Sequence, residues 1–200
     1  MKNIIKNACI LLAITVVAGA LLGVVYNVTK EPIAQAQETA KQEAYQSVLS
    51  DATEYETLEF DEDEASALLT ENGFDSDDIT EIAAGLDASG ETIGYVVTVT
   101  SHEGYGGDIE ISIGILTDGT VKGIEMLDID ETAGLGMKAT EDDFKDQFKD
   151  KNEEQFEYTK TGETGDNMID ALSGATITTN AVTNGVNAGL VYFQNVLGGE

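Results

Sequence analysis

The sequence contains no arginine and only one residue each of cysteine, histidine and proline among its 200 residues. The single cysteine, Cys9, excludes an internal disulfide, and with His102 as the lone histidine the chain has too few ligands for its own zinc or iron–sulfur site. One Pro against 21 Gly excludes collagen-like and proline-rich classes. The 38 acidic residues and ten Lys give a net charge of −28, so the chain lacks the basic face that nucleic-acid backbones require.

The first 26 residues have no acidic side chain, and Lys2 and Lys6 are their only charges. Residues 8–26 are uncharged, and as a helix they would span about 28 Å, close to the roughly 30 Å of a bilayer core. The lysines favour a cytoplasmic N-terminus at 1–7. We predict a permanent transmembrane helix. A cleaved signal peptide ending at Ala34–Ala36 and a buried soluble helix are the alternatives.

The rest of the chain predicts an α+β domain, with an antiparallel sheet packed by helices. The isoleucines of 109–115 alternate with polar or small residues, as in a half-buried strand, and Asp118-Gly119 is a hairpin signal. We expect a connecting segment, helical and acidic, at 27–75, and one extracytoplasmic domain at 76–200. Helices are expected at 31–50, with Pro32 near the helix start, and at 65–69, 140–149 and 177–197; strands are expected at 79–86, 93–100, 109–115 and 121–127.

The segment from Asp170 to Thr176 is the strongest candidate for chemistry, because it precedes the last predicted helix. Small residues allow a ligand to approach the backbone, and the free amides and dipole of a helix N-terminus favour an anion such as phosphate. A hydroxyl there is placed to contact or esterify that phosphate. An ordinary Ser or Thr N-cap explains the same residues equally well.

Two further loops are rich in glycine. Gly104, Gly106 and Gly107 surround Tyr105 between two predicted strands, which allows close backbone approach beside an aromatic ring. The loop 131–136 follows the second strand of the hairpin. Taken singly, each is equally compatible with a flexible connection or a turn glycine.

Taken together, the three loops resemble the covalent-FMN domain that the G subunit of the Rnf complex shares with the C subunit of the sodium-pumping NADH:quinone oxidoreductase. Asp170 to Thr176 matches the signature Asp-x-x-Ser/Thr-Gly-Ala-Thr of that family throughout. The other two loops resemble its Gly-Tyr-Gly-Gly and Glu-Thr-Pro-Gly-Leu-Gly segments, with Ala133 in place of the usual Pro. The resemblance runs from about residue 93 to the C-terminus, and the chain length is more similar to that of the Rnf protein.

The resemblance implies that Thr176 carries FMN through a phosphoester, installed by a separate flavin transferase. That enzyme would recognise Asp170, Ser173, Gly174 and Ala175. The flavin would supply the electron chemistry, so no catalytic residue of the chain is needed. Ser173, Gly174 and Ala175 are also implied to bind the cofactor. The other residues implied to bind it are Gly104, Tyr105, Gly106, Gly107, Glu131, Thr132, Gly134, Leu135 and Gly136.

The resemblance also implies partners. The chain would relay electrons inside a membrane complex that couples reduced ferredoxin and NAD⁺ to Na⁺ or H⁺ translocation, and it would not be catalytic alone. A membrane-anchored flavoprotein of the same domain family outside Rnf, and a non-redox surface binding domain, are the alternatives. A flavin-tuning role for His102 is a secondary hypothesis. Acidic runs such as 61–64 either concentrate cations near the membrane or, as we favour, form a solvated surface.

Overall fold

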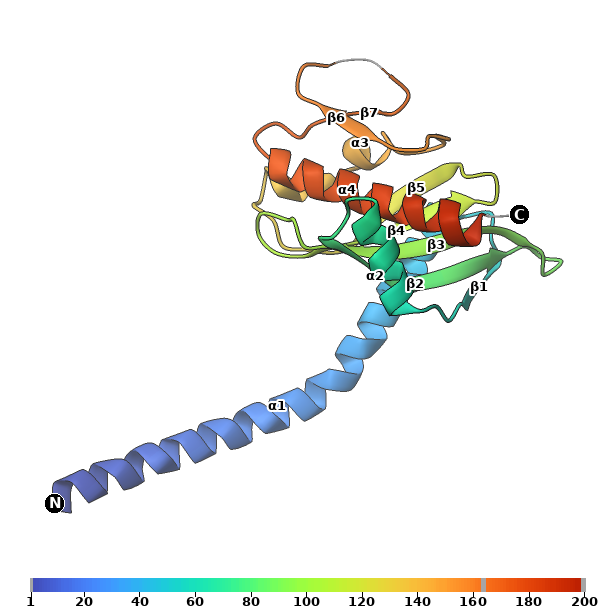
Figure 1. The fold of residues 1–200 in the computed structure, drawn as a ribbon. Coiled ribbons are helices and arrows are strands. Elements are labelled where there is room, and N and C mark those ends of the chain that lie inside the picture. The colour runs from blue at the N-terminus through green and yellow to red at the C-terminus, as the bar shows by residue number, and fades with distance from the viewer. Residues whose placement is uncertain (1, 163–164, 199–200) are drawn as a thin grey trace. The chain divides into compact units, whose positions relative to one another are not determined.

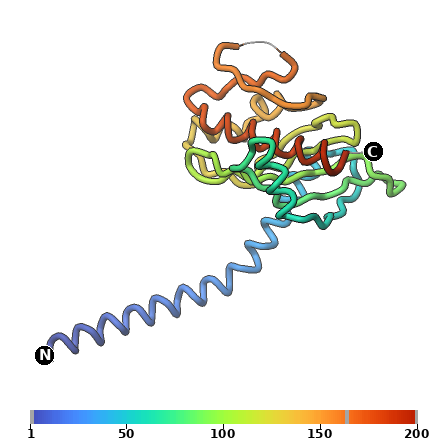
Figure 2. The backbone as a smooth tube through the Cα atoms, in the orientation of Figure 1, coloured from blue at the N-terminus to red at the C-terminus, as the bar shows by residue number. Residues whose placement is uncertain are grey.

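The structure is a computed structural model that describes residues 2–162 and 165–198. Figure 1 shows its helices and strands, and Figure 2 traces the backbone from the N-terminus to the C-terminus. The chain divides into two compact units that meet between Lys41 and Gln42. The first unit is helical, and the second contains all the strands.

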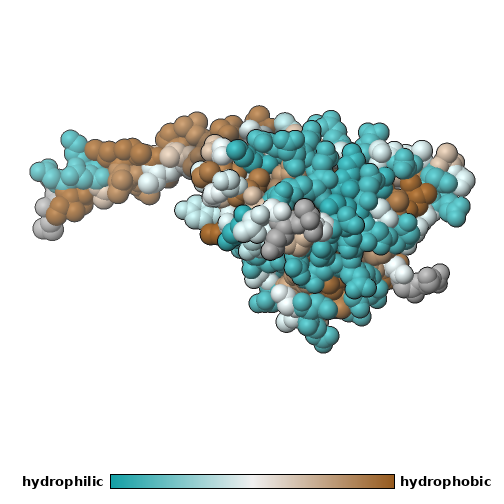
Figure 3. Space-filling view, turned by 90° about the horizontal axis from the view of Figure 1, so that it is seen from above, coloured by the Kyte–Doolittle hydropathy of each residue, from teal (hydrophilic) through white to brown (hydrophobic). Residues whose placement is uncertain are grey.

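Helix α1 (Lys2–Val48) includes the apolar segment predicted to cross the membrane. Among the described residues it is the one helix whose length and composition suit a membrane span. The apolar side chains of residues 8–26 are exposed, and Figure 3 shows them as a brown surface, in contrast to the mainly hydrophilic surface elsewhere in that view. The expectation that Pro32 lies near a helix start is wrong. Pro32 lies inside α1, because the helix continues past it without a break.

Five strands form one antiparallel sheet in chain order, which confirms the predicted sheet. Tight turns join the central strands, and Gly90 and Gly119 adopt φ angles of 83° and 88° in them, a region that favours glycine. Strand β1 was not predicted, because its four residues are largely exposed and acidic. The strands are β1 (Glu54–Thr57), β2 (Asp77–Leu86), β3 (Thr92–Ser101), β4 (Ile109–Leu116) and β5 (Val121–Ile129).

Helices α2 (Glu62–Glu71) and α4 (Thr176–Tyr192) cover one face of the sheet (Figure 1). The α2 N-terminus is capped by Asp61, whose carboxylate accepts the N–H groups of Asp63 and Glu64. Helix α4 approaches the sheet closely because it carries glycine where it crosses β4. A methyl group on Gly189 would lie 2.6 Å from Cδ1 of Ile113. The isoleucines of β4 are fully buried there, as the alternation predicted.

The opposite face of the sheet receives the last turns of α1, residues 42–48. Tyr45, Val48 and Leu49 form a second small core there. Glycines on the sheet make room for this helix end. A methyl group on Gly114 would lie 2.1 Å from the carbonyl oxygen of Val48, and one on Gly85 would lie 2.4 Å from Cδ2 of Leu49.

In its described residues, the chain segment that connects β5 to α4 forms only short elements. The helix expected at 140–149 is reduced to a 3-10 turn, η1 (Gly136–Thr140), and one turn of α-helix, α3 (Asp142–Lys145). Hydrogen bonds of i to i−3 spacing, such as Phe148 N–H to Lys145, end the helix early, although Phe144 and Phe148 are buried as their spacing suggested. Strands β6 (Glu157–Thr159) and β7 (Met168–Asp170) form a parallel pair, and α4 ends in the π-helical turn η2 (Phe193–Leu197).

Candidate functional site

The three glycine-containing loops meet at one pocket of about 580 Å³. This volume lies within the range of small-molecule sites, roughly 300–1,000 Å³. The loop before α4, the loop after β5 and the loop between β3 and β4 each contribute side chains to it. The lining residues are Tyr105, Glu131, Thr132, Leu135, Gly136, Gly174, Ala175, Thr176, Ile177 and Thr178.

The N-terminus of α4 forms one wall of the pocket. Thr176 is the first helical residue, and the N-cap is Ala175, with no side-chain hydrogen bond to the helix end. The interpretation that Ser173 or Thr176 is an ordinary N-cap is therefore wrong. Gly174 adopts a φ angle of 78°, which turns the chain into the helix. The first N–H groups of α4 have no intrahelical acceptor, so they are available to an anion.

Thr179 fixes this helix entrance from inside the fold. Its buried hydroxyl accepts the Leu172 N–H at 3.0 Å and donates to the Ala175 carbonyl at 3.0 Å. Both bonds tie the preceding loop to the first turn of α4. The position of the Thr176 hydroxyl is consequently set by a closed backbone turn rather than by a flexible loop.

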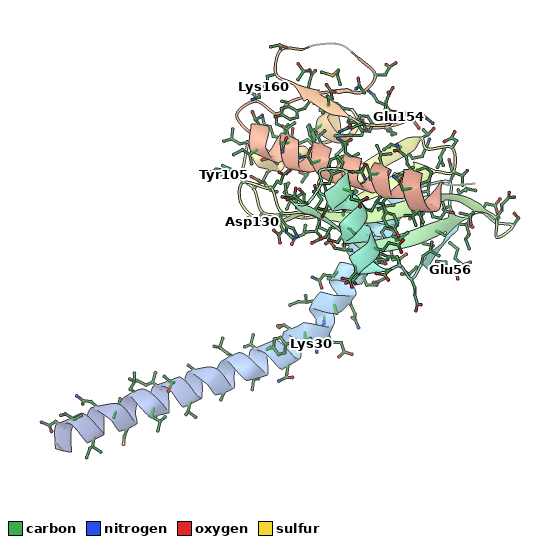
Figure 4. The ribbon with its side chains drawn as sticks, viewed as in Figure 1. Lys30, Glu56, Tyr105, Asp130, Glu154 and Lys160 are labelled. Carbon is green, nitrogen blue, oxygen red and sulfur yellow. The ribbon has the colours of Figure 1, made fainter. Side chains whose placement is uncertain are left out.

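Glu131 joins the other two loops. It is 8% exposed, and its Oε1 accepts the backbone N–H groups of Tyr105 at 2.7 Å and Gly106 at 3.3 Å. The two loops are in close contact, because a methyl group on Gly106 would lie 1.9 Å from the carbonyl oxygen of Asp130. Figure 4 shows Tyr105 and Asp130 at the same end of the molecule. A carboxylate that accepts two backbone amides holds the Tyr105 loop in one conformation.

Gly136 lies where the loop after β5 reaches α4. A methyl group there would lie 2.6 Å from the Thr178 hydroxyl and 2.7 Å from Oε2 of Glu131. Gly134 has a φ angle of 75°, so the predicted turn at this glycine is present. Ala133, the departure from the family pattern, is exposed beside it and does not line the pocket.

The rim of the pocket is apolar. In the described parts of the second unit, 42–162 and 165–198, four large hydrophobic side chains are exposed, and three of them line this pocket. Tyr105 is 70% exposed, Ile177 52% and Leu135 41%. Exposed apolar groups that gather around a concave site indicate a surface for an apolar or aromatic ligand.

A polar network supports the Tyr105 loop from behind. The Glu103 carboxylate accepts the side-chain amides of Asn180 and Asn184 at 3.1 and 2.6 Å, which ties the loop to α4. His102 lies between Asp78 and Asp108, with ring nitrogens 3.0 and 2.9 Å from their carboxylates. Hydrogen bonds to Asp108 and then to Asp78 raise the pKa of His102 above its ordinary value. His102 does not line the pocket.

Sequence reasoning located the pocket but did not give its complete lining. Ile177 and Thr178 line it and were not predicted, although they directly follow the proposed attachment residue. Several predicted residues stand beside the pocket rather than in its lining: Gly104, Gly106, Gly107, Gly134, Asp170 and Ser173. Of these, Asp170 is exposed at the end of β7, and its backbone N–H donates to Oε1 of Gln147 at 2.6 Å.

Comparison with known proteins identifies two regions of the chain. Residues 1–48 match the RnfG N-terminal region, and residues 104–191 match the FMN-binding domain, which contains all three loops of the pocket. A relative from Acetobacterium woodii, the G subunit of the Na⁺-translocating ferredoxin:NAD⁺ oxidoreductase complex, is 34% identical over 98% of this chain and 94% of its own.

The chain belongs to the RnfG family. Similar relatives include the G subunit of the proton-translocating ferredoxin:NAD⁺ oxidoreductase complex of Clostridium ljungdahlii, 30% identical over 92% of this chain and 88% of its own. Another is the G subunit of the ion-translocating oxidoreductase complex of Methanosarcina acetivorans, 31% identical over 96% and 95%. The predicted family resemblance is thereby confirmed.

Among solved structures, the C subunit of the Na⁺-translocating NADH-quinone reductase from Parabacteroides distasonis is similar. It has a TM-score of 0.49 and 18% identity over 83% of this chain and 96% of its own. The NqrC protein of Shewanella oneidensis has a TM-score of 0.48 and 24% identity over 57% of each chain.

Proposed function

We propose that this chain is the electron-transfer flavoprotein subunit of a membrane-bound, ion-translocating ferredoxin:NAD⁺ oxidoreductase, with FMN bound covalently to Thr176. One observation carries the proposal: Thr176 lies at an uncapped helix N-terminus and opens into a pocket with an exposed apolar rim. The two ends of this pocket suit the two ends of FMN.

The phosphate end of the cofactor suits the start of α4. The free amides and the helix dipole at the start of α4 favour negative charge, and they are the phosphate-binding groups that this wall of the pocket offers. The Thr176 hydroxyl oxygen would form the bond to phosphorus, and joining the hydroxyl to the phosphate releases one water in the overall condensation. A phosphoester retains the cofactor outside the cytoplasm, where no free flavin pool would replace it.

The ring end of the cofactor suits the apolar rim. Tyr105, Leu135 and Ile177 surround the opening, and each side chain is at least two-fifths exposed. Covering them with a planar aromatic ring removes apolar surface from water, at about 25 cal/mol per Å². Glu131 keeps Tyr105 in place for this contact through its bond to the Tyr105 N–H.

FMN, when bound, supplies the electron-accepting and electron-donating chemistry. The residues of the chain orient it: the α4 N-terminus binds the phosphate, and the Tyr105 loop and residues 131–136 hold the ring. An open pocket at the surface lets a redox partner approach the ring closely, and electron transfer requires no general base.

The remaining parts of the proposal concern the assembly. Helix α1 would anchor the chain in the membrane with residues 1–7 in the cytoplasm and the pocket outside. The relatives are named as subunits of multi-subunit complexes, so we propose that the electron donor, the acceptor and the ion pathway lie on other subunits. A flavin transferase that recognises Asp170, Ser173, Gly174 and Ala175 would attach the cofactor, and the exposure of Asp170 and Ser173 suits recognition by another protein.

The proposal is tested by producing the full chain together with a flavin transferase and viewing a denaturing gel under ultraviolet light. A fluorescent band is expected for the wild type and for Thr132→Ala, which removes a hydroxyl from the opposite wall of the same pocket. No fluorescent band is expected for Thr176→Ala. Fluorescence that survives in Thr176→Ala would overturn the attachment site, and a colourless wild type from its native membranes would favour a non-redox binding domain.

A further inference from the structure

A carboxylate that the proposed function does not use lies beneath α4. Asp77 begins β2 and is the direct cross-strand partner of Ser101, the last residue of β3. Asp77 is 3% exposed and Ser101 is fully buried. Buried carboxylates are rare unless they are paired with a cation or with several donors, so this pair requires an explanation.

The pair lacks such a set of donors. Oδ1 of Asp77 and Oγ of Ser101 are both buried without a hydrogen bond of proper geometry, although the Ser101 hydroxyl lies close enough to Asp77 to favour its ionised form. Helix α4 passes directly over them with a glycine: a methyl group on Gly185 would lie 3.7 Å from Cβ of Ser101 and 3.8 Å from Oδ1 of Asp77. Helix α4 has no titratable side chain before Tyr192, so it offers no countercharge.

The groups around Asp77 make its negative charge unfavourable. Burial raises the pKa of Asp77 to about 6, and the nearby Glu103 charge acts in the same direction. The Ser101 hydroxyl and His102 favour the ionised form, and Asp78 opposes it, but burial outweighs them. The Ser101 hydroxyl can turn to donate to a carboxylate or to accept from a carboxylic acid, so both protonation states fit the same pair.

The pair is connected to the pocket through rigid contacts. Glu103, which follows Ser101 by two residues, bonds to Asn180 and Asn184 on α4 and leads directly into the Tyr105 loop. Gly185 and Thr176 are nine residues apart on α4, or roughly 13 Å along the helix axis. Asp77 lies beneath Gly185, so its charge is on the order of this distance from the N-terminus of α4, which is close enough inside the protein to influence a redox group there.

We propose that Asp77, paired with Ser101 beneath α4, is a proton-binding site linked to the redox state of the pocket. This proposal rests on the proposed function. When an electron enters the pocket from a one-electron carrier, the added negative charge favours uptake of one proton from water by the Asp77 carboxylate, forming one O–H bond. When the electron leaves for the next carrier, the proton returns to water.

The first test follows Asp77 in the full chain produced without flavin transferase. The carboxylic C=O stretch is recorded by infrared spectroscopy from pH 4 to 9. A buried acid band that disappears with a midpoint near pH 6 is expected in the wild type and absent from Asp77→Asn. Ser101→Ala should move that midpoint to higher pH, because it removes a group that favours the carboxylate. The absence of such a band from the wild type would overturn the proton site, whatever the cofactor.

The second test follows the midpoint potential of the FMN-loaded chain against pH, with dithionite as reductant and ferricyanide as oxidant. The wild type and Asp77→Asn should have the same potential near pH 4.5, and the wild type should become the more negative of the two as pH rises through 6. Asp75→Asn removes an exposed charge two residues away and should leave the wild-type curve unchanged.

The possible outcomes test the proton site, its redox link and the proposed function separately. A constant difference between the wild type and Asp77→Asn at every pH would overturn the redox link while leaving the proton site. Failure of every variant to retain flavin would overturn the proposed function and the redox link together, and the infrared titration would still decide whether Asp77 binds a proton near pH 6.

Discussion

The two faces of the five-stranded sheet are built differently. On one face, buried isoleucines of β4 pack against α4, whose first residue is Thr176. On the other face, glycines such as Gly114 allow residues 42–48 of α1 to pack close to the strands. Both faces use glycine for close approach, but the glycines lie on the helix on the first face, as at Gly189, and on the strands on the second, as at Gly114. The start of α4 and residues 42–48 of α1 are therefore fixed to the same sheet by independent sets of contacts.

The largest effect on stability is expected on the face of the sheet that α4 covers. Ile113→Ala removes a fully buried side chain beneath Gly189 of α4, and large-to-alanine changes of this kind cost about 2–5 kcal/mol. Urea unfolding of the full chain in detergent should show this loss, together with less flavin on Thr176, since α4 carries this proposed attachment residue. Unchanged stability would contradict the packing described for this face.

The next effect depends on pH and also belongs to the α4 face. The pKa of Asp77 is raised in the folded protein, so folding favours its protonated form and stability falls as pH rises from about 4 to 6. Asp77→Asn should increase the free energy of unfolding at pH 7.5 by up to about 3 kcal/mol and change it little at pH 3.5. An equal effect at both pH values would contradict a titrating buried acid.

On the face that receives residues 42–48 of α1, one added methyl group should be enough to destabilise the domain. Gly114→Ala forces the Val48 carbonyl away and should destabilise the domain by about 1–3 kcal/mol. Gly123→Ala is the matched control, because its methyl group would meet Val48 only at an ordinary distance, 3.8 Å from Cα. The melting temperature of Gly114→Ala should be the lower of the two. Equal melting temperatures would contradict the close packing of Val48 against Gly114.

The smallest effect concerns the contact between Glu131 and the Tyr105 loop. Glu131→Ala leaves two backbone N–H groups at Tyr105 and Gly106 without their acceptor, at a cost of about 1–2 kcal/mol, whereas Glu131→Gln retains an acceptor oxygen. Amide hydrogen exchange at residues 105–106 should accelerate in the alanine variant and much less in the glutamine variant. Equal protection in both would show that the carboxylate does not hold this loop.

The sequence predicted the parts of the fold whose hydrophobicity alternates regularly, although β4 is buried on both faces, with Ser112 fully buried, and not half-buried as expected. The isoleucines of β4 and the Asp118-Gly119 turn repeat local rules, so the central hairpins were correct. Strand β1 and the parallel pair of β6 and β7 were missed, because they have three or four residues each and depend on partners distant in the chain. The helix at 140–149 was overestimated because two aromatic residues four apart are buried by tertiary packing, not by a continuous helix.

The candidate site was predictable to a similar degree. The motif from Asp170 to Thr176 located the pocket, since its glycine and hydroxyl spacing is local to the sequence. The two carboxylate contacts behind it were not predictable: Glu131 reaches Tyr105 across 26 residues, and Glu103 reaches Asn184 across 81. Asp77 gave no signal at all, because its burial beneath Gly185 exists only in the folded chain.

Attachment of FMN to Thr176 can be tested by peptide mass mapping of the chain purified from its native membranes. The last Lys is Lys160, so trypsin releases residues 161–200 as one peptide that contains Thr176. We expect the mass of this peptide to be increased by the mass of FMN less one water, and we expect fragmentation to place the added mass on Thr176. A peptide 161–200 with the mass of the bare sequence, or with the flavin on another residue, would contradict it.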